Sequence, residues 1–313
     1  MREASAIPTE HPVENVPRAL TYSLAELDAP PDSDLVQIRD LIYQVAGIFH
    51  PDTKLRLLHD RCARRMKEVK AASLREYLEH LTCKATRHTE LITLLNEITI
   101  GETCFCRSQP QLDAVRQIIL PRMLEAKAKL PIRRFRIWSA GCSTGEEPYT
   151  LAMILQEESQ RLKDWNIEIL ATDINERALA HARSATYGPH STRYLAAHHQ
   201  QKYFVALGNE LQVHRSVRKP VTFTRLNLFD DAQISLMKNL DLIFCCNVLI
   251  YFDLASKQRV IQHFYNSLLP HGYLFLGQTE SLYRVNDQFR LIHFPGATAY
   301  VRDDHSSAGG QAL

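Results

Sequence analysis

Apolar residues recur every three or four positions through the first third of the chain. Leu35 and Ile38 fall on one side of a helical wheel, and the pattern that they begin ends at Gly47. A second apolar stripe covers residues 55–69, and further stripes of the same period follow it. The last of them is expected to break at Pro121, because proline cannot donate a helical hydrogen bond. The spacing therefore predicts a bundle of four or five helices.

The two ends of the chain lack this periodicity. Residues 1–34 hold five of the fourteen prolines and are expected to be a disordered tail, and residues 302–313 are expected to be a second, short tail. Residues 35–130 are predicted to form a small helical domain together with the linker to the next domain.

The apolar period changes at Arg134. Short apolar or β-branched runs appear at residues 135–138, 167–170, 221–226, 240–246 and 273–277, and helical stretches separate several of them. Strands that alternate with helices predict an α/β fold, with a doubly wound, parallel, Rossmann-like sheet over residues 131–301. The alternation lapses over residues 187–219, a polar and turn-rich stretch that is too long for a plain connection. This stretch is predicted to be a small, β-rich inserted subdomain.

Composition restricts the function less than the pattern does. The chain has 313 residues and a net charge of +2, which gives no reason to expect a nucleic-acid partner. No apolar run approaches the ~20 residues of a membrane span, so direct membrane insertion is not expected. The seven cysteines are odd in number and lack metal-ligand spacing. A cytoplasmic protein without a metal is therefore expected.

The loop after the first predicted strand reads SAGCSTGEEPY, over residues 139–149. A Walker loop needs a lysine after its second glycine, but Gly145 is followed by Glu146, and the dinucleotide fingerprint G-x-G-x-x-G is also absent. The topology still places a ligand at the carboxyl edge of the sheet. A ligand beside two carboxylates is expected to be cationic or rich in hydroxyl groups.

A second acid, Asp173, ends the next predicted strand. A carboxylate at this place accepts hydrogen bonds from both hydroxyls of a ribose. A ribose, a positive charge and no phosphate together describe S-adenosylmethionine, so the spacing favours a methyltransferase. The plainer interpretation is that Glu146 and Glu147 only favour a helix N-terminus, and one of them could do no more than that.

Five motifs occur in a fixed order along the chain: WSAGCSTGEEPYTLAM, ATDIN, NLF, FCCNVLIYFD and GYLFLGQTESL. In this order the sequence resembles the chemotaxis-receptor methyltransferases, which transfer a methyl group from S-adenosylmethionine to receptor glutamate side chains. The likeness runs from about residue 35 to residue 301, and it takes in the helical domain and the inserted subdomain. It implies a protein-glutamate O-methyltransferase.

The resemblance also implies a set of site residues. Glu147 would bind the amino group of the cofactor and Asp173 its ribose, and the rest of the cofactor pocket would be formed by Asn227, Leu228, Cys246 and Asn247. The linker TIGETCFCR, residues 99–107, matches a family motif in which Thr103 and Arg107 contact cofactor and substrate. Tyr251 matches a tyrosine beside the transferred methyl, so Arg107 and Tyr251 are the expected catalytic residues.

Three positions depart from the family pattern. Gly101 stands where asparagine is usual, Cys106 replaces a phenylalanine, and Cys246 replaces an arginine. The loss of one neutral hydrogen bond costs about 1 kcal/mol, so weaker cofactor binding is compatible with these changes and its abolition is not. A signalling module that binds the cofactor with weak or no turnover stays open as an alternative, as does a methyltransferase for a small molecule.

The expected partner is the cytoplasmic helical region of a chemoreceptor. Over residues 53–71, seven Lys or Arg residues stand against two acids. A solvated basic face is the commoner explanation of such a run. Because receptor helices are acidic around their target glutamates, steering by Arg56, Arg61, Arg64 and Lys67 is a reasonable hypothesis. The inserted subdomain could grip a receptor tether, and a monomer is expected.

Overall fold

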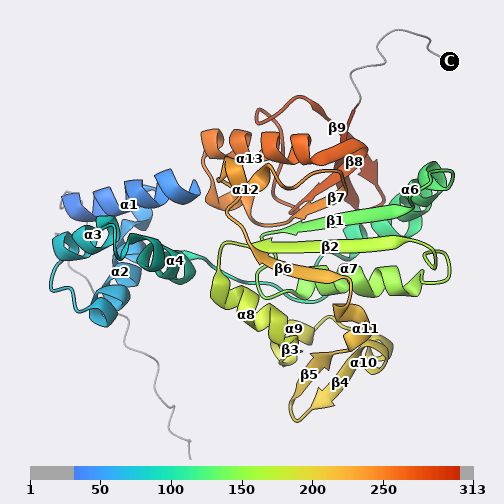
Figure 1. The fold of residues 1–313 in the computed structure, drawn as a ribbon, viewed down its shortest axis with the longest axis horizontal. Coiled ribbons are helices and arrows are strands. Elements are labelled where there is room, and N and C mark those ends of the chain that lie inside the picture. Colours follow the sequence, from blue (N-terminus) through green and yellow to red (C-terminus); the bar gives the residue numbers. More distant parts are fainter. Residues whose placement is uncertain (1–31, 304–313) are drawn as a thin grey trace, which may run out of the picture.

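The computed structural model describes residues 32–303, so most of the two predicted tails lies outside the described residues. The first domain is helical (Figure 1). It consists of α1 (Ser33–Ala46), a 3-10 turn η2 (Asp52–Lys54), α2 (Leu55–Val69), α3 (Leu74–Thr82) and α4 (Arg87–Ile98). Within residues 32–303, no helix is both long enough and apolar enough to cross a membrane.

Helix α1 shows how local sequence sets these boundaries. The side chain of Asp32 accepts hydrogen bonds from the backbone N–H groups of Asp34 and Leu35 and so caps the start of the helix. The helix begins at Ser33, within the tail predicted over residues 1–34. Gly47 ends the helix in the left-handed conformation, with φ of 69°, as the pattern predicted. The buried residues of α1 to α4 pack into one cluster of their own, so the helical domain has its own core.

The helix that was expected to break at Pro121 does not break there. Helix α5 (Gln109–Ala114) continues into a π-helical turn η3 (Val115–Ile119) and then into α6 (Leu120–Lys127). Because the wider turn comes directly before Pro121, proline falls in the first turn of α6, where its missing N–H is tolerated. The predicted break was wrong, because the chain stays helical through Pro121.

The second domain is built on a seven-stranded sheet in the order β6-β2-β1-β7-β8-β10-β9. Its strands are β1 (Arg134–Ala140), β2 (Asn166–Asp173), β6 (Val221–Arg225), β7 (Leu240–Cys245), β8 (Leu268–Leu276), β9 (Phe289–Phe294) and β10 (Ala297–Arg302). The first five are parallel, as predicted. The pair β9 and β10 is antiparallel and was not anticipated, so the sheet is mostly rather than wholly parallel.

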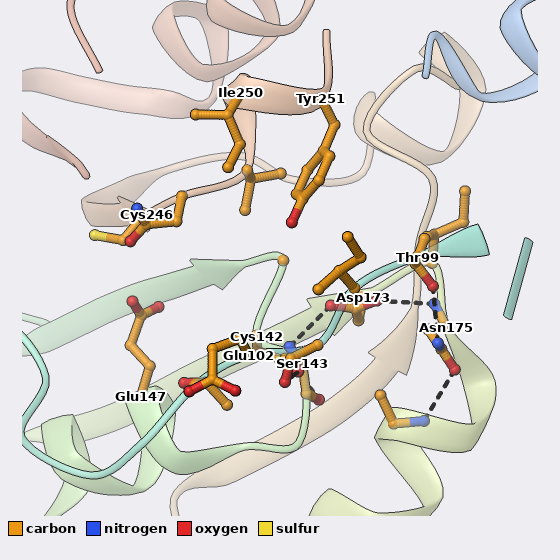
Figure 2. Close-up of a pocket in the computed structure, with 18 of the residues that line it drawn as sticks. Thr99, Glu102, Cys142, Ser143, Glu147, Asp173, Asn175, Cys246, Ile250 and Tyr251 are labelled. Carbon is orange, nitrogen blue, oxygen red and sulfur yellow. Dashed lines mark hydrogen bonds between the residues drawn. The ribbon is translucent and has the colours of Figure 1, made fainter. Parts of the chain in front are cut away.

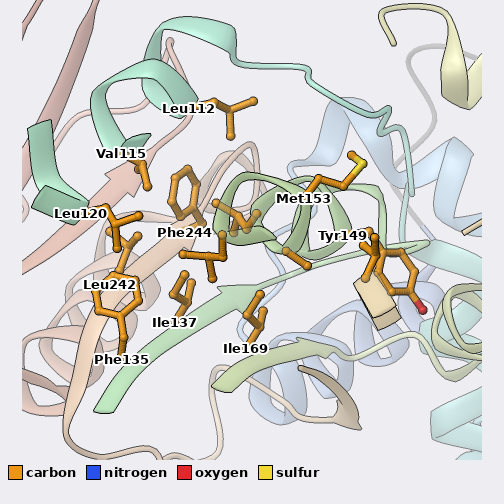
Figure 3. Close-up of a cluster of buried hydrophobic side chains, with 14 of the residues drawn as sticks. Leu112, Val115, Leu120, Phe135, Ile137, Tyr149, Met153, Ile169, Leu242 and Phe244 are labelled. Atoms are coloured by element: carbon orange, nitrogen blue, oxygen red, sulfur yellow. The ribbon is translucent and has the colours of Figure 1, made fainter. Parts of the chain in front are cut away.

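Helices cover both faces of this sheet (Figure 1). Helices α7 (Glu146–Glu157) and α8 (Glu176–Ser184) lie on one side, and α12 (Asp231–Ile234) and α13 (Leu254–Ser267) lie on the other. Along β1 the side chains alternate, so that Ile137 joins one buried cluster and Trp138 the other. Figure 3 shows the cluster on the α7 side, where Phe135, Ile137 and Phe244 meet Leu112 and other apolar residues of α5 to α7. Burial on both faces explains why the strands read as continuous apolar runs.

The interruption between β2 and β6 is a small subdomain with its own sheet. Strands β3 (Thr186–Tyr187), β5 (Glu210–Val213) and β4 (Phe204–Leu207) pair antiparallel in the order β3-β5-β4. The short helices α9 (Pro189–Thr192), α10 (Ala197–Tyr203) and α11 (Arg215–Arg218) accompany them. The predicted β-rich insert is thus confirmed, with β3 as its first strand.

Candidate active site

A cavity opens at the carboxyl ends of β1, β2, β6 and β7, where the sheet meets the helical domain and the linker (Figure 2). Its walls include the segment after α1, the first turn of α2, the linker 98–107 and the loops that follow the four strands. All nine residues expected to hold the cofactor or to act in catalysis line it: Thr103, Arg107, Glu147, Asp173, Asn227, Leu228, Cys246, Asn247 and Tyr251. The structure therefore gathers residues that lie up to 148 positions apart in the chain.

Gly141 and its neighbours fix the shape of the loop after β1. Gly141 has a φ of 77°, and a Cβ there would lie 2.4 Å from a methyl carbon of Val248, so only glycine fits. The backbone N–H groups of Gly141 and Cys142 donate to the carbonyl of Thr172. The loop consequently brings its backbone close to the end of β2, which leaves room for a ligand above it.

The two adjacent acids at the start of α7 do different things. Glu146 is 1% exposed, accepts a hydrogen bond of 2.6 Å from the Thr144 hydroxyl and does not line the cavity. Glu147 faces the cavity (Figure 2), and one of its carboxylate oxygens accepts a hydrogen bond of 2.6 Å from the Ser139 hydroxyl. Consecutive helix residues point about 100° apart, which separates the pair. The interpretation that these acids only favour a helix N-terminus therefore applies to Glu146 but not to Glu147.

Enclosure by protein changes the acidity of Glu147. Burial raises the pKa of this carboxyl to about 7, although the Ser139 hydroxyl, the Cys246 thiol and the charge of Arg107 all oppose the rise. The exposed part of the side chain opens to the cavity rather than to the outer surface. A buried carboxylate without a paired cation is costly, so this position favours a ligand that carries positive charge.

Asp173 closes the floor of the cavity at the end of β2. Its two carboxylate oxygens accept backbone hydrogen bonds of 2.8 Å from Ser143 and from Asn175 (Figure 2). Burial raises the pKa of Asp173, and those backbone donors oppose the rise. Each oxygen keeps a further lone pair for a donor in the cavity, such as a ribose hydroxyl.

Asn227 and Leu228 follow β6 on the wall nearest the helical domain. The Asn227 amide donates a hydrogen bond of 2.7 Å to the carbonyl of Val45, and its oxygen accepts one of 3.0 Å from the N–H of Phe229. Asn227 therefore joins the two domains as well as lining the cavity, which the resemblance did not indicate. Leu228 is 8% exposed and supplies an apolar surface at the same wall.

The loop after β7 depends on a residue to which no role was assigned in the sequence. Glu280 accepts backbone hydrogen bonds from Asn247 at 2.8 Å, Ile250 at 3.2 Å and Gly277 at 2.7 Å. Asn247 has a φ of 61°, a left-handed conformation that this clamp maintains. The motif GQTESL contains Glu280, so the signal was present, but only the fold shows which backbone groups it binds.

Cys246 stands on this loop where the family has an arginine. Its thiol lies 3.6 Å from the side-chain oxygen of Gln111, and the Gln111 amide donates to the carbonyl of Leu276 at 2.6 Å. Burial raises the pKa of Cys246 well above its ordinary value, and the negative charge of Glu147 adds to the rise. The thiol is therefore neutral, and it provides a small, weakly polar wall beside Glu147.

The linker passes over the cavity from α4 to α5. Gly101 packs directly against the loop after β1, because a Cβ there would lie 2.8 Å from the Ser143 hydroxyl, which donates to the Gly101 carbonyl at 3.1 Å. The departure from asparagine thus leaves a close contact rather than a gap. Cys106 has a φ of 58°, and its N–H donates to the Thr150 hydroxyl at 3.2 Å, which fixes the turn before Arg107.

Arg107, on the linker, and Tyr251, after β7, both line the cavity. The Arg107 guanidinium donates a hydrogen bond of 2.7 Å to the carbonyl of Glu102, which leaves its other donors available. In Figure 2 the Tyr251 ring points from its wall toward the side on which Glu147, Ser143 and Asp173 lie. Burial raises the pKa of Tyr251, and the charge of Arg107 opposes the rise, so the two side chains are near enough to interact.

The four basic residues predicted to bind a receptor all lie on α2, and none of them lines the cavity. Arg56, Arg64 and Lys67 are exposed, and Arg61 is half-buried. Their neighbour Arg65 is different, because it forms an ion pair with Glu90, and the hydrogen bonds of its fork measure 2.9 and 3.0 Å. Arg65 therefore stabilises the helical domain.

The residues that line the cavity fit S-adenosylmethionine. One wall offers an enclosed carboxylate for an ammonium group, and the floor offers a second carboxylate for a ribose. The wall beside Asn227 is partly apolar, as a purine requires. Nothing in the loop after β1 provides the lysine that a triphosphate needs.

Comparisons with known proteins agree with this geometry. Residues 101–297 match the family described as "CheR methyltransferase, SAM binding domain", and residues 33–99 match "CheR methyltransferase, all-alpha domain". The chain is 34% identical over 272 residues to chemotaxis protein methyltransferase 2 of Vibrio cholerae, and the match covers 87% of this chain and 93% of that protein. It is also 34% identical over 251 residues to a chemotaxis protein methyltransferase of Borreliella burgdorferi, which covers 80% and 88% of the two chains.

Solved structures resemble the chain only distantly. Magnesium protoporphyrin IX methyltransferase from Synechocystis is 15% identical with a TM-score of 0.32, and the match covers 88% of this chain and 97% of that one. The assignment depends instead on the family matches, which take in both domains, and on relatives above 30% identity over most of their length. The chain belongs to the CheR methyltransferase family and is an S-adenosylmethionine-dependent methyltransferase.

Proposed function

We propose that this enzyme transfers the methyl group of S-adenosylmethionine to glutamate side chains of chemoreceptors, giving glutamate methyl esters and S-adenosylhomocysteine. The observation that carries the proposal is that Arg107 and Tyr251 line the same cavity as Glu147 and Asp173. The names of the relatives, chemotaxis protein methyltransferases, support the same substrate class. We also infer that it works as a cytoplasmic monomer on the cytoplasmic helices of those receptors.

Each proposed role follows from the chemistry of the side chain. Glu147 would pair with the ammonium group of the cofactor, Asp173 would accept from its ribose hydroxyls, and Asn247 and Cys246 would border the same end. Thr103, on the linker, would add a hydroxyl contact from above. When bound, S-adenosylmethionine supplies a methyl group on a positively charged sulfur that a carboxylate can take up by in-line displacement.

Arg107 is suited to hold the incoming carboxylate. A guanidinium binds a carboxylate through two parallel hydrogen bonds, which fixes its direction as well as its position. The bond to the Glu102 carbonyl anchors one edge of the Arg107 fork and restricts its motion. Tyr251 would add a hydroxyl donor to the same carboxylate.

No general base is required for this reaction. An ionised glutamate is already nucleophilic, so the enzyme contributes mainly alignment, which can lower a barrier by up to ~7–11 kcal/mol. This explains how a site whose cysteine thiols are kept neutral by burial can still be catalytic. It also separates the enzyme from nucleophilic hydrolases, which need an activated nucleophile.

A labelled methyl donor tests the proposal directly. The protein is incubated with receptor-containing membranes and S-adenosylmethionine labelled in its methyl group, and base-labile label is counted in the receptor. Incorporation that depends on the enzyme supports glutamate methylation. Cofactor binding without any incorporation would instead favour a signalling module without turnover. Label in a small molecule would favour a methyltransferase that acts on small molecules.

A further inference from the structure

Large apolar side chains gather around the mouth of the active-site cavity. Among the described residues, four large hydrophobic side chains that line the cavity are 45–55% exposed: Phe49, Leu57, Ile100 and Ile250. We call these four the apolar rim. They come from the segment after α1, from α2, from the linker and from the loop after β7. Exposed apolar side chains grouped at a catalytic cavity are typical of a surface that another molecule covers.

The cofactor alone does not account for this rim. The carboxylates expected to bind it, Glu147 and Asp173, lie on the sheet side of the cavity, whereas Figure 2 shows Ile250 and Tyr251 on the opposite wall. Each rim residue keeps about half of its surface exposed. These exposed apolar side chains are therefore available to a second molecule that covers the cavity.

Helix α2 connects the rim to a basic surface. At 100° per residue, Leu57, Arg61 and Arg64 fall within about 60° of one another on α2. Leu57 and the preceding Lys54 line the cavity, and Arg61 and Arg64 lie on the same face of α2 as Leu57, farther along the helix. Basic side chains therefore lie both at the cavity and farther along α2.

Acidic residues on α2 limit how much of the attraction is electrostatic. Asp60 and Glu68 lie close to the same face, so Arg61 and Arg64 are opposed by two acids there. Over residues 53–71 the balance is still seven Lys or Arg against two acids. A partner that binds here therefore needs negative charge, but it must also gain contact with apolar surface at the rim.

We propose that the apolar rim is the docking surface for an acidic, amphipathic acceptor helix, whose apolar side chains cover Phe49, Leu57, Ile100 and Ile250 while the target glutamate enters between them. This inference rests on the proposed function. On a helix, residues three and four positions from the target point to the same side, so they meet the rim when the glutamate reaches Arg107. Acidic residues farther along the acceptor then face Arg61 and Arg64.

The test uses the full chain and two rim residues that lie outside the proposed machinery. Leu57→Gln, alone and combined with Ile100→Gln, removes apolar contact while Leu57→Met with Ile100→Val preserves it. The expected result is about a tenfold rise in the KM for receptor in the double variant, with kcat and the Kd for S-adenosylhomocysteine changed less than twofold. The conservative pair should restore the wild-type KM. Leu236→Gln, at a residue 80% exposed and away from the cavity, is the matched control.

Three outcomes would overturn the proposal, and they are distinguishable. If the wild type methylates receptor and Leu57→Gln and the double variant leave its KM unchanged, the rim is not the docking surface although the proposed function stands. If sedimentation shows that the double variant converts a dimer to a monomer at unchanged KM, the rim binds a second copy of this chain. If the wild type transfers no methyl group to receptor, the proposed function fails and the acceptor helix fails with it.

Discussion

Replacement of Glu147 by glutamine should strengthen the ligand-free protein and weaken its hold on the cofactor. Burial raises the pKa of this carboxyl from its usual 4.5 to about 7. As pH rises from 4.5 to 7, the unfolded chain loses this proton before the folded protein does, so stability is complete below pH 4.5 and falls through this window. The full shift corresponds to at most about 3 kcal/mol. Above pH 7, the Glu147→Gln variant should regain part of that amount.

Cofactor binding should respond in the opposite direction. A charge-assisted hydrogen bond contributes about 1.5–3 kcal/mol, so the Kd of Glu147→Gln for S-adenosylhomocysteine should rise by a factor of roughly 10 to 150. Because a ligand ammonium stabilises the ionised carboxylate, binding at pH 6 should release most of one proton from Glu147 in the wild type. The variant should release none from this position.

Two measurements check the pair of effects. Urea unfolding at pH 5 and pH 8 gives the stability difference, and calorimetry at pH 6 in buffers of different ionisation enthalpy gives the proton count. Glu146→Gln is the matched control, since Glu146 is buried beside Glu147 but bonds only inside the fold. Equal proton release in wild type and Glu147→Gln would refute the assignment of this carboxylate to the ammonium site.

Three further results are expected. Arg107→Lys keeps a charge but loses the planar fork, so steady-state kinetics should show kcat/KM for receptor lowered by about 10- to 100-fold and the Kd for S-adenosylhomocysteine altered less than threefold. Reversal of charge with Arg61→Glu and Arg64→Glu should raise the KM for receptor without a change in that Kd, and high salt should reduce the difference between variant and wild type. Asn227→Ala removes the donor to the Val45 carbonyl and should lower the free energy of unfolding by about 1–2 kcal/mol in a urea titration.

The sequence was sufficient for features that depend on local pattern. The five parallel strands are apolar because both faces of the sheet are covered, and Asp173 could be placed at a strand end because strand and acid are contiguous. The antiparallel strands β9 and β10 were missed. Polar and apolar residues are mixed along β9, and the position of the two strands depends on the pairing of β10 with β8 and of β9 with β10 rather than on their own composition.

Other features could not be predicted, because they depend on contacts between distant parts of the chain. Asn227 and Val45 are 182 positions apart, and nothing local to either indicates that they share a hydrogen bond. The residue pattern alone did not distinguish Glu146 from Glu147, because the distinction depends on the direction of the first turn of α7, and only the family resemblance pointed to Glu147. The hydrogen bonds of Glu280 likewise could not be predicted, because they form only where the loops after β7 and β8 lie side by side.

The helical domain is part of the active site rather than an appendage to it. The Tyr43 hydroxyl donates to Asp253 at 2.9 Å, and the Phe49 N–H donates to the carbonyl of Tyr251 at the same distance. These bonds fix the backbone of Tyr251 from the side of the helical domain. The linker that carries Arg107 also leaves that domain, directly after α4. The placement of one domain on the other therefore sets the positions of both groups proposed to act on the acceptor, whereas the carboxylates proposed to hold the cofactor belong to the sheet domain alone.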